Sequence, residues 1–219
     1  MKVIIMGANG KVGRLIAQKM SASDEFEPTA LIRKKEQKAY FDSIGVPVVV
    51  ESIENSEENI GDAIRGFDAV VFSAGSGGAT GADKTIEVDL FGAVKTIEAA
   101  KKNSISRFVM ISAALSDDPS SWTSDGMKPY YIAKHMADKE LKRSGLDYTI
   151  VRPVMLTDND DAGKITIQSE THQLNKEIPR AAVAETVLKV LPNSGTHSKI
   201  LEMSEGSSEI GKAIAEFVT

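Results

Sequence analysis

The stretch MKVIIMGANGKVGRLIAQKM, residues 1–20, decides the fold of this chain. Its first apolar run, VIIM, consists mostly of β-forming residues and stops at three glycines spaced as Gly7-x-x-Gly10-x-x-Gly13. Apolar residues then recur at helical intervals, which indicates an amphipathic helix after the glycines. The sequence therefore predicts a buried strand, a sharp turn and a helix at the start of the chain.

Short apolar runs alternate with helical patterns through the rest of the chain. The predicted strands are 2–6, 28–32, 46–50, 68–75, 107–113, 146–153, 164–168 and 199–203, and the predicted helices are 12–20, 33–45, 57–66, 82–102, 129–145, 181–191 and a last one at the C-terminus. This alternation indicates a parallel sheet covered on both faces. We expect an α/β fold with a doubly wound parallel sheet (Rossmann-type), in one domain of residues 1–219 whose residues 154–219 form a small C-terminal lobe.

The bulk composition excludes several classes of protein. The 219 residues carry a formal net charge of −5, which argues against a nucleic-acid or anionic-membrane surface. No apolar run is long enough to span a bilayer, and the first residues do not resemble a signal peptide. The chain has no cysteine, so it has neither disulfides nor thiolate catalysis. We expect a cytoplasmic protein, either a monomer or a small homo-oligomer.

The glycine turn has the features of a dinucleotide site. The first glycine permits the tight turn, the second lets the backbone approach a pyrophosphate, and the third lets the helix pack on the sheet. The helix N-terminus then offers free N–H groups to the phosphates. Glycines also mark ordinary turns, but the strand before and the helix after favour the dinucleotide interpretation. The expected contacts of this turn are Gly7, Asn9, Gly10, Lys11, Val12 and Gly13.

Basic residues follow the second predicted strand. A site that prefers NAD has an acidic residue about 20 positions after the glycines, whereas this chain has Arg33 and Lys34. The alternative is a solvated charge run, partly balanced by Glu36. Basic residues oppose the dipole at a helix start, and a guanidinium suits phosphate geometry. We therefore predict that the cofactor is NADP(H), with Arg33 and Lys34 at its 2′-phosphate.

A tyrosine and a lysine share one face of the helix predicted for 129–145. Tyr130 and Lys134 are four residues apart, and an ammonium near a phenol lowers the pKa of that phenol. The same lysine can hold the nicotinamide ribose, and Ser112 at the end of a predicted strand can orient a carbonyl substrate. Tyr131 is the competing tyrosine, and an aromatic core residue beside a solvated lysine is the alternative to a catalytic pair.

These segments together carry a family resemblance. GANGKVG, VFSAG, VDLFGAVKTIEAA, FVMISA, YYIAK and LDYTIVRP occur in the order seen in short-chain dehydrogenases/reductases. The chain resembles the atypical branch, which includes flavin/biliverdin-reductase-like proteins and nitrogen-regulator-type NADP-binding proteins. The resemblance implies a serine, tyrosine and lysine catalytic set at Ser112, Tyr130 and Lys134. Asp89 stands where the better-known enzymes have an active-site asparagine.

The resemblance also implies further cofactor contacts. The residues expected along the nicotinamide are Pro153, Val154 and Met155, and those expected near the adenine are Glu51 and Ser52. The glycine-rich stretch SAGSGGATGAD, which begins with Ser73, Ala74 and Gly75, is expected to pass over the cofactor.

We expect no metal site. The histidines His135, His172 and His197 are scattered, and the acidic run at 158–161 lacks the glycine and distal glutamate of a calcium loop, so a polar turn is the simpler interpretation.

The sequence thus favours an NADPH-dependent oxidoreductase that transfers hydride to a small carbonyl, quinone or flavin-like acceptor. The alternative is a non-catalytic NADP(H)-sensing regulatory protein that binds a protein partner. Nucleotide-sugar epimerase or dehydratase chemistry is a third hypothesis, and the short region after Pro153 argues against it because little material remains to enclose a nucleotide sugar.

Overall fold

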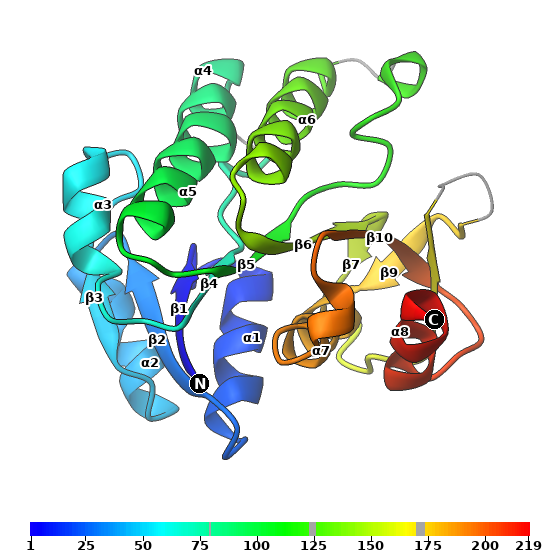
Figure 1. Ribbon diagram of the computed structural model, residues 1–219, viewed down its shortest axis with the longest axis horizontal. Coiled ribbons are helices and arrows are strands. Elements are labelled where there is room, and N and C mark those ends of the chain that lie inside the picture. The colour runs from blue at the N-terminus through cyan, green and yellow to red at the C-terminus, as the bar shows by residue number, and fades with distance from the viewer. Residues whose placement is uncertain (79, 123–125, 170–173) are drawn as a thin grey trace.

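The computed structural model describes residues 1–78, 80–122, 126–169 and 174–219. Within these ranges, eight strands form one sheet in the order β3-β2-β1-β4-β5-β6-β10-β8, and β7 pairs with β9 in a separate two-stranded sheet (Figure 1). The strands are β1 (Lys2–Met6), β2 (Glu27–Ile32), β3 (Val48–Val50), β4 (Ala69–Phe72), β5 (Arg107–Ile111), β6 (Asp147–Pro153), β7 (Met155–Thr157), β8 (Ile165–Gln168), β9 (Glu177–Pro179) and β10 (Lys199–Glu205).

Helices cover both faces of the large sheet, with α1 and α7 on one face and α3, α5 and α6 on the other (Figure 1). The α-helices are α1 (Lys11–Ser21), α2 (Lys38–Ser43), α3 (Glu57–Ala63), α4 (Ala82–Lys84), α5 (Gly92–Lys102), α6 (Lys128–Arg143), α7 (Arg180–Val190) and α8 (Ile210–Val218). The 3₁₀ helices are η1 (Lys35–Gln37), η3 (Pro119–Ser121) and η5 (Ser194–Thr196), and η2 (Thr85–Phe91) is a π-helix. No helix in the described part of the chain is both long and apolar enough to cross a bilayer.

Alternate side chains of β1 enter two separate cores. Val3 and Ile5 join the cluster beneath α1 and α7, while Ile4 and Met6 join the cluster beneath α3, α5 and α6. All four side chains are fully buried. A central parallel strand buries both faces, which explains why the first apolar run is continuous rather than alternating. The predicted Rossmann-type doubly wound sheet is confirmed.

The strand order reverses direction between β1 and β4. Both strands are parallel, and β1 pairs with β2 on one side and with β4 on the other. The backbone N–H of Ser73, just past β4, still donates to the carbonyl of Met6 at 3.0 Å. Ligands of open α/β sheets bind outside the carboxyl ends of the strands at such a reversal. The glycine turn that follows Met6 therefore lies at the expected binding edge.

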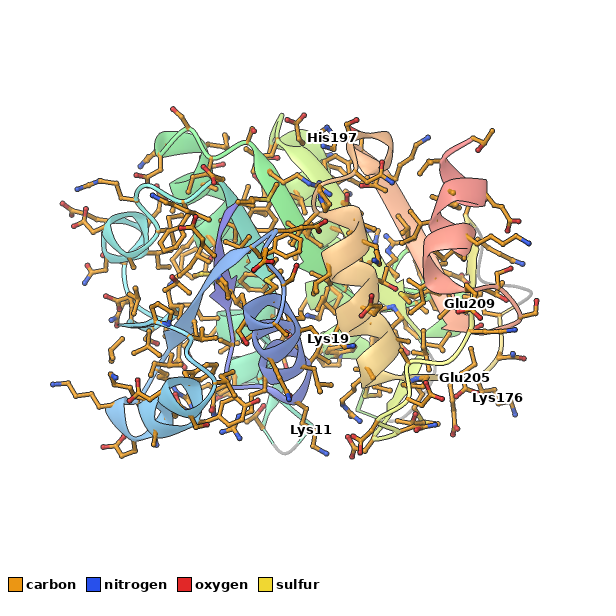
Figure 2. The ribbon with its side chains drawn as sticks, turned by 90° about the horizontal axis from the view of Figure 1, so that it is seen from below. Lys11, Lys19, Lys176, His197, Glu205 and Glu209 are labelled. Atoms are coloured by element: carbon orange, nitrogen blue, oxygen red, sulfur yellow. The ribbon has the colours of Figure 1, made fainter. Side chains whose placement is uncertain are left out.

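The residues after Pro153 extend the large sheet. β10 pairs parallel with β6, and β8 closes the edge antiparallel to β10. α7 packs against α1, where Lys19 pairs with Glu185 at 3.0 Å; Figure 2 shows Lys19 on α1 beside α7. Buried Arg107 on β5 adds hydrogen bonds to the carbonyls of Val190 and Leu191 at the end of α7. These contacts join the C-terminal part to the core of the sheet.

Two predicted helices differ from the structure. The region 33–45 contains the short η1 and α2 instead of one helix. The region 82–102 is helical throughout, but its middle is the π-helix η2 rather than a regular α-helix. η2 packs mainly on α6, whereas α5 packs mainly on α3 and also contacts α6. Hydrophobic spacing predicts a helix but not this change in hydrogen-bond register.

Candidate functional site

The glycine turn is built by close approach of three backbone segments. Gly7 has φ of +72°, and a Cβ atom there would lie 2.5 Å from the Cα of Ala74. A Cβ at Gly13 would lie 2.6 Å from the carbonyl oxygen of Gly7, which also accepts a hydrogen bond from the N–H of Gly10 at 3.0 Å. The packing of the turn therefore requires glycine at positions 7 and 13.

The N-terminus of α1 has neither a side-chain cap nor an acidic residue in its first turn, and its N-cap residue is Gly10. The first N–H groups of a helix lack intrahelical partners, and the helix dipole places partial positive charge there. Exposed Lys11 lies at the same end (Figure 2), and its Nζ pairs with Oδ2 of Asp158 at 2.7 Å. This arrangement fits a pyrophosphate.

A cavity of about 350 Å³ opens beside this turn. It lies at the carboxyl ends of β1 to β4, where the sheet order reverses. The predicted cofactor residues that line it are Gly7, Asn9, Gly10, Arg33, Glu51, Ser52, Ser73, Ala74 and Gly75. The structure thus brings together nine predicted residues that come from four separate strand ends.

Other predicted residues of this half lie outside the cavity wall. Val12 and Gly13 are buried beneath the turn, while Lys11 and Lys34 are exposed. The backbone N–H groups of Arg33 and Lys34 both donate to Oε1 of Gln37 at 3.1 Å, which fixes the turn after β2.

Nine further lining residues were not singled out from the sequence, although two of them, Ser76 and Thr80, lie in the glycine-rich stretch expected to pass over the cofactor. The nine residues are Leu31, Ile32, Gln37, Ile53, Glu54, Ser76, Thr80, Lys84 and Val88. Ile32, Ile53 and Ser76 are each next to a predicted residue, so for these three the position at a strand end was the available signal. Glu54 and Lys84 had no such signal, because their side chains meet only in the folded chain.

Arg33 is already paired in the structure. Its Nη1 lies 3.2 Å from Oε1 of Glu54, and the other oxygen of Glu54 lies 2.6 Å from Nζ of Lys84. Lys84 also pairs with Glu87 at 2.6 Å. The hydrogen bond from Lys84, together with the charges of both cations, holds the pKa of Glu54 below its usual value despite partial burial. The predicted 2′-phosphate residue therefore has a carboxylate partner of its own.

Tyr130 faces Lys134, while Tyr131 faces away from it. The Nζ of Lys134 lies 5.7 Å from the ring centroid of Tyr130. Tyr131 stacks on Trp122 with centroids 6.4 Å apart and planes 2° from parallel, and His135 meets the edge of the same indole. This geometry agrees with the choice of Tyr130 over Tyr131 as the lysine's partner.

The prediction that Lys134 leaves the Tyr130 phenol with a lowered pKa is wrong. Burial raises the pKa of Tyr130, and the neighbouring Asp89 raises it further, so that together they outweigh the Lys134 ammonium. Lys134 is only 5% exposed, which by itself lowers its pKa, but Tyr130 and Asp89 more than offset this and the pKa is raised overall. Lys134 is therefore charged, and its charge is shared with a carboxylate.

Asp89 links the lysine to the cavity wall. Its Oδ1 lies 3.1 Å from Nζ of Lys134, and its Oδ2 accepts a hydrogen bond from the backbone N–H of Ser76 at 2.8 Å. Ser76 lines the cavity, and Asp89 is only 1% exposed. The π-helix η2 thus presents a buried carboxylate at this position. π-helical segments are frequent at functional sites.

Ser112 follows the last residue of β5 and is 4% exposed. Its N–H donates to the carbonyl of Val151 at 2.8 Å, while its hydroxyl makes no hydrogen bond of regular geometry to the described residues. That hydroxyl faces Asp138, a buried carboxylate that also accepts from Ser116 and Arg152. The Ser112 hydroxyl is therefore buried against Asp138, and a ligand at this position would compete with that carboxylate for its proton.

A buried charge cluster lies beneath Ser112. Arg152 pairs with Asp138 at 2.9 Å, Glu202 at 2.8 Å and Asp117 at 2.7 Å. Burial raises the pKa of Asp138 although Arg152 and the two serine hydroxyls act in the opposite direction. The cluster places one guanidinium among three carboxylates.

Pro153 ends β6, Val154 follows it and Met155 begins β7; β6 pairs with β5, the strand that Ser112 follows. The carbonyl of Pro153 accepts from the N–H of Ala114 at 3.0 Å, and the N–H of Val154 donates to Met203 at 3.1 Å. Met155 is 62% exposed at the start of β7. These residues do not line the cavity beside the glycine turn, so they belong to a separate part of the same edge.

In the described part of the chain, no group of three histidine or acidic side chains could hold a metal ion. Asp158 instead pairs with Lys11 and Arg180, and Asn159 and Asp161 accept backbone N–H groups of their own turn, as a polar turn requires. His135 contacts Trp122, His197 lies 3.6 Å from Asp147, and His172 lies outside the described residues.

Comparison with known proteins agrees with this geometry. A family model described as NAD(P)H-binding matches residues 7–194. A Bacillus subtilis (strain 168) protein named "Uncharacterized sugar epimerase YhfK" is 40% identical over 98% of this chain and 99% of its own length. A solved structure of a putative NAD-dependent epimerase/dehydratase from Bacillus halodurans is 39% identical, with a TM-score of 0.93 over 99% of this chain and 100% of that chain.

A second solved structure, the oxidoreductase ylbE from Lactococcus lactis, is 32% identical, with a TM-score of 0.85 over 99% of this chain and 96% of that chain. Together these matches confirm the predicted resemblance to the atypical branch of short-chain dehydrogenases/reductases.

Proposed function

We propose, since the chain belongs to the NAD(P)H-binding family, that it is an NADPH-dependent oxidoreductase that reduces a small carbonyl, quinone or flavin-like acceptor. The observation that supports this most directly is the buried Lys134, which lies beside Tyr130 and is joined through Asp89 to the wall of the cavity at the glycine turn. We also propose that the chain acts as one domain, with residues 154–219 on the substrate side.

The residues of the cavity fit a dinucleotide. The α1 N-terminus would hold the pyrophosphate, the cavity at β1 to β4 would hold the adenosine, and Arg33 would meet the 2′-phosphate. Pro153 to Met155 would lie along the nicotinamide. The bound cofactor supplies the hydride.

The chain itself supplies the proton and orients the acceptor. The Ser112 hydroxyl would donate a hydrogen bond to the acceptor oxygen, and the Tyr130 hydroxyl would give its proton to that oxygen as hydride reaches the adjacent atom. The Lys134 ammonium would stabilise the phenolate that remains and hold the nicotinamide ribose. Because burial raises the pKa of Tyr130, the phenol stays protonated and able to donate at neutral pH.

Epimerase chemistry is the second candidate, because two of the most similar proteins carry that word in their names. The residues after Pro153 argue against it, since β8, β10, α7 and α8 complete and cover the large sheet rather than form a separate sugar-binding domain.

The test is NADPH oxidation measured across a panel of small carbonyls, quinones and flavins with wild type, Tyr130→Phe and Tyr131→Phe. Loss of turnover by about 10²-fold or more in Tyr130→Phe alone supports the proposal, because general acids contribute about that much. The Tyr131 variant is the matched control, since that ring stacks on Trp122.

Three results would contradict the proposal. Tight NADP(H) binding without turnover across the panel would favour the cofactor-sensing alternative. Interconversion of nucleotide sugars without net NADPH oxidation would favour an epimerase. Full activity in Tyr130→Phe would remove the proposed proton donor.

A further inference from the structure

A carboxylate lies between two cations at the wall of the cavity. Arg33 follows β2 and Lys84 ends α4, and both pair with opposite oxygens of Glu54 at 3.2 Å and 2.6 Å. Arg33 and Lys84 are far apart in sequence, so only the fold brings them together. All three residues line the cavity.

Glu54 is the most enclosed member of this triad. Its side chain is 21% exposed, compared with 60% for Arg33 and 41% for Lys84. Its backbone N–H donates to the Ser52 hydroxyl at 3.2 Å, and the next residue, Asn55, accepts a hydrogen bond from buried Lys95 at 2.6 Å. The loop that carries Glu54 is therefore held to α5, and the carboxylate is presented at a fixed place.

The charges of the triad limit what the cavity can accept. Arg33 and Lys84 are balanced by Glu54 and by Glu87, the other partner of Lys84. A dianionic phosphate that enters beside Arg33 meets a set of charges that is already neutral. Strong binding of that phosphate requires both cations to turn from Glu54 to the phosphate oxygens.

We propose that Glu54 is a built-in counter-anion that sets the choice between NADP(H) and NAD(H), and that Lys84 is a second cation for the 2′-phosphate. This inference rests on the proposed function, because it concerns the adenosine end of the same cofactor. With NADP(H), Arg33 and Lys84 turn from Glu54 to the oxygens of the 2′-phosphate. With NAD(H), Glu54 stays in place and accepts a hydrogen bond from the ribose 2′-hydroxyl.

The two variants that separate these roles have opposite expected effects. Glu54→Gln keeps the shape but removes the competing charge, so affinity for 2′-phosphorylated nucleotides rises on the order of tenfold, while affinity for unphosphorylated ones does not rise. Lys84→Met keeps the length but removes a cation, so affinity for 2′-phosphorylated nucleotides falls on the order of tenfold and affinity for the others is unchanged.

The experiment is isothermal titration calorimetry, which measures the affinity of wild type and of each variant for 2′,5′-ADP, 5′-AMP, NADPH and NADH at two salt concentrations. Glu98→Gln is the matched control, because Glu98 pairs with Lys101 at 2.7 Å on the surface of α5 with similar exposure and lies outside the cavity wall. Circular dichroism confirms that each variant is folded. The salt dependence of 2′,5′-ADP binding is expected to weaken in Lys84→Met, because one ionic contact is lost.

The outcomes distinguish this inference from the proposed function. If wild type binds neither NADPH nor NADH, the proposed function fails. If both bind but Glu54→Gln leaves the NADPH-to-NADH affinity ratio within twofold of the Glu98→Gln control, Glu54 is not a counter-anion. The proposed function is then unaffected. If Lys84→Met weakens NADH and NADPH equally, Lys84 is not a 2′-phosphate residue.

Discussion

Replacing Gly7 by alanine tests whether the glycine turn is shaped by its own backbone packing. Two penalties act at this position. Its φ of +72° lies in the left-handed region, which costs a residue with a Cβ about 1–2 kcal/mol. The added Cβ would also lie 2.5 Å from the Cα of Ala74, and forcing an extra carbon into a packed interior costs about 1–3 kcal/mol. We expect Gly7→Ala to lower the free energy of unfolding by about 2–5 kcal/mol.

Two other glycines separate the penalties. Gly45 has φ of +69° with nothing within 4 Å of its missing Cβ, so Gly45→Ala should cost only about 1–2 kcal/mol. Gly13 lies in α1 without a positive φ, but its Cβ would lie 2.6 Å from the carbonyl oxygen of Gly7. Gly13→Ala should therefore show the packing cost, reduced by up to about 1 kcal/mol of gained helix propensity.

Urea unfolding of the three variants and wild type, followed by far-ultraviolet circular dichroism, gives the comparison. The dependence of the unfolding free energy on urea is expected to stay unchanged while the midpoints shift. If Gly7→Ala is no less stable than Gly45→Ala, the close approach of Ala74 imposes no constraint. The glycine would then be explained by its backbone conformation and its ligand alone.

Three further predictions concern the buried charges. Arg152→Met should lower the free energy of unfolding at neutral pH by about 3–5 kcal/mol, because buried Asp138 and Glu202 lose their cation; a loss below about 1 kcal/mol in urea unfolding would contradict this. Because burial raises the pKa of Asp138 above 3.8, its folded carboxyl holds its proton at higher pH than the unfolded one, and ionising it costs stability as the pH rises above that value. The free energy of unfolding of wild type minus that of Asp138→Asn should therefore fall as the pH rises from about 4. A difference that rises instead would show that the attraction of Arg152 for the ionised carboxylate outweighs the cost of burying it. Asp89→Asn should lower the pKa of the Tyr130 phenol, because that anion raises it; ultraviolet phenolate titration against Tyr130→Phe measures the shift, and no movement would contradict the Asp89 effect.

The fold was predictable because its signals are local. The apolar runs, the glycine spacing and the helical periodicity each lie within about 20 residues, and alternation of strands and helices leaves few topologies for a parallel sheet. The strand ends then locate the cavity, which is why nine predicted cofactor residues line it.

The parts that sequence could not supply depend on tertiary contacts. The four-residue spacing places Tyr130 and Lys134 on one face of α6, but it carries no information on burial, so the direction of the phenol pKa was wrong. Glu54 and Lys84 lie 30 residues apart, and no periodicity connects them. Burial and long-range pairing decide electrostatics, and both arise only in the folded chain.

The geometry of the site depends on the number of residues in the π-helix η2. Deleting one residue between Thr85 and Phe91 other than Asp89 would let i→i+4 bonds replace the wider turn, and side chains within this stretch would then change their angular positions around the helix axis. Asp89 and Lys84 could then no longer both keep their partners, although neither had been mutated. Insertions and deletions in this stretch should therefore be tolerated less well than most substitutions of its exposed side chains, such as Ile86.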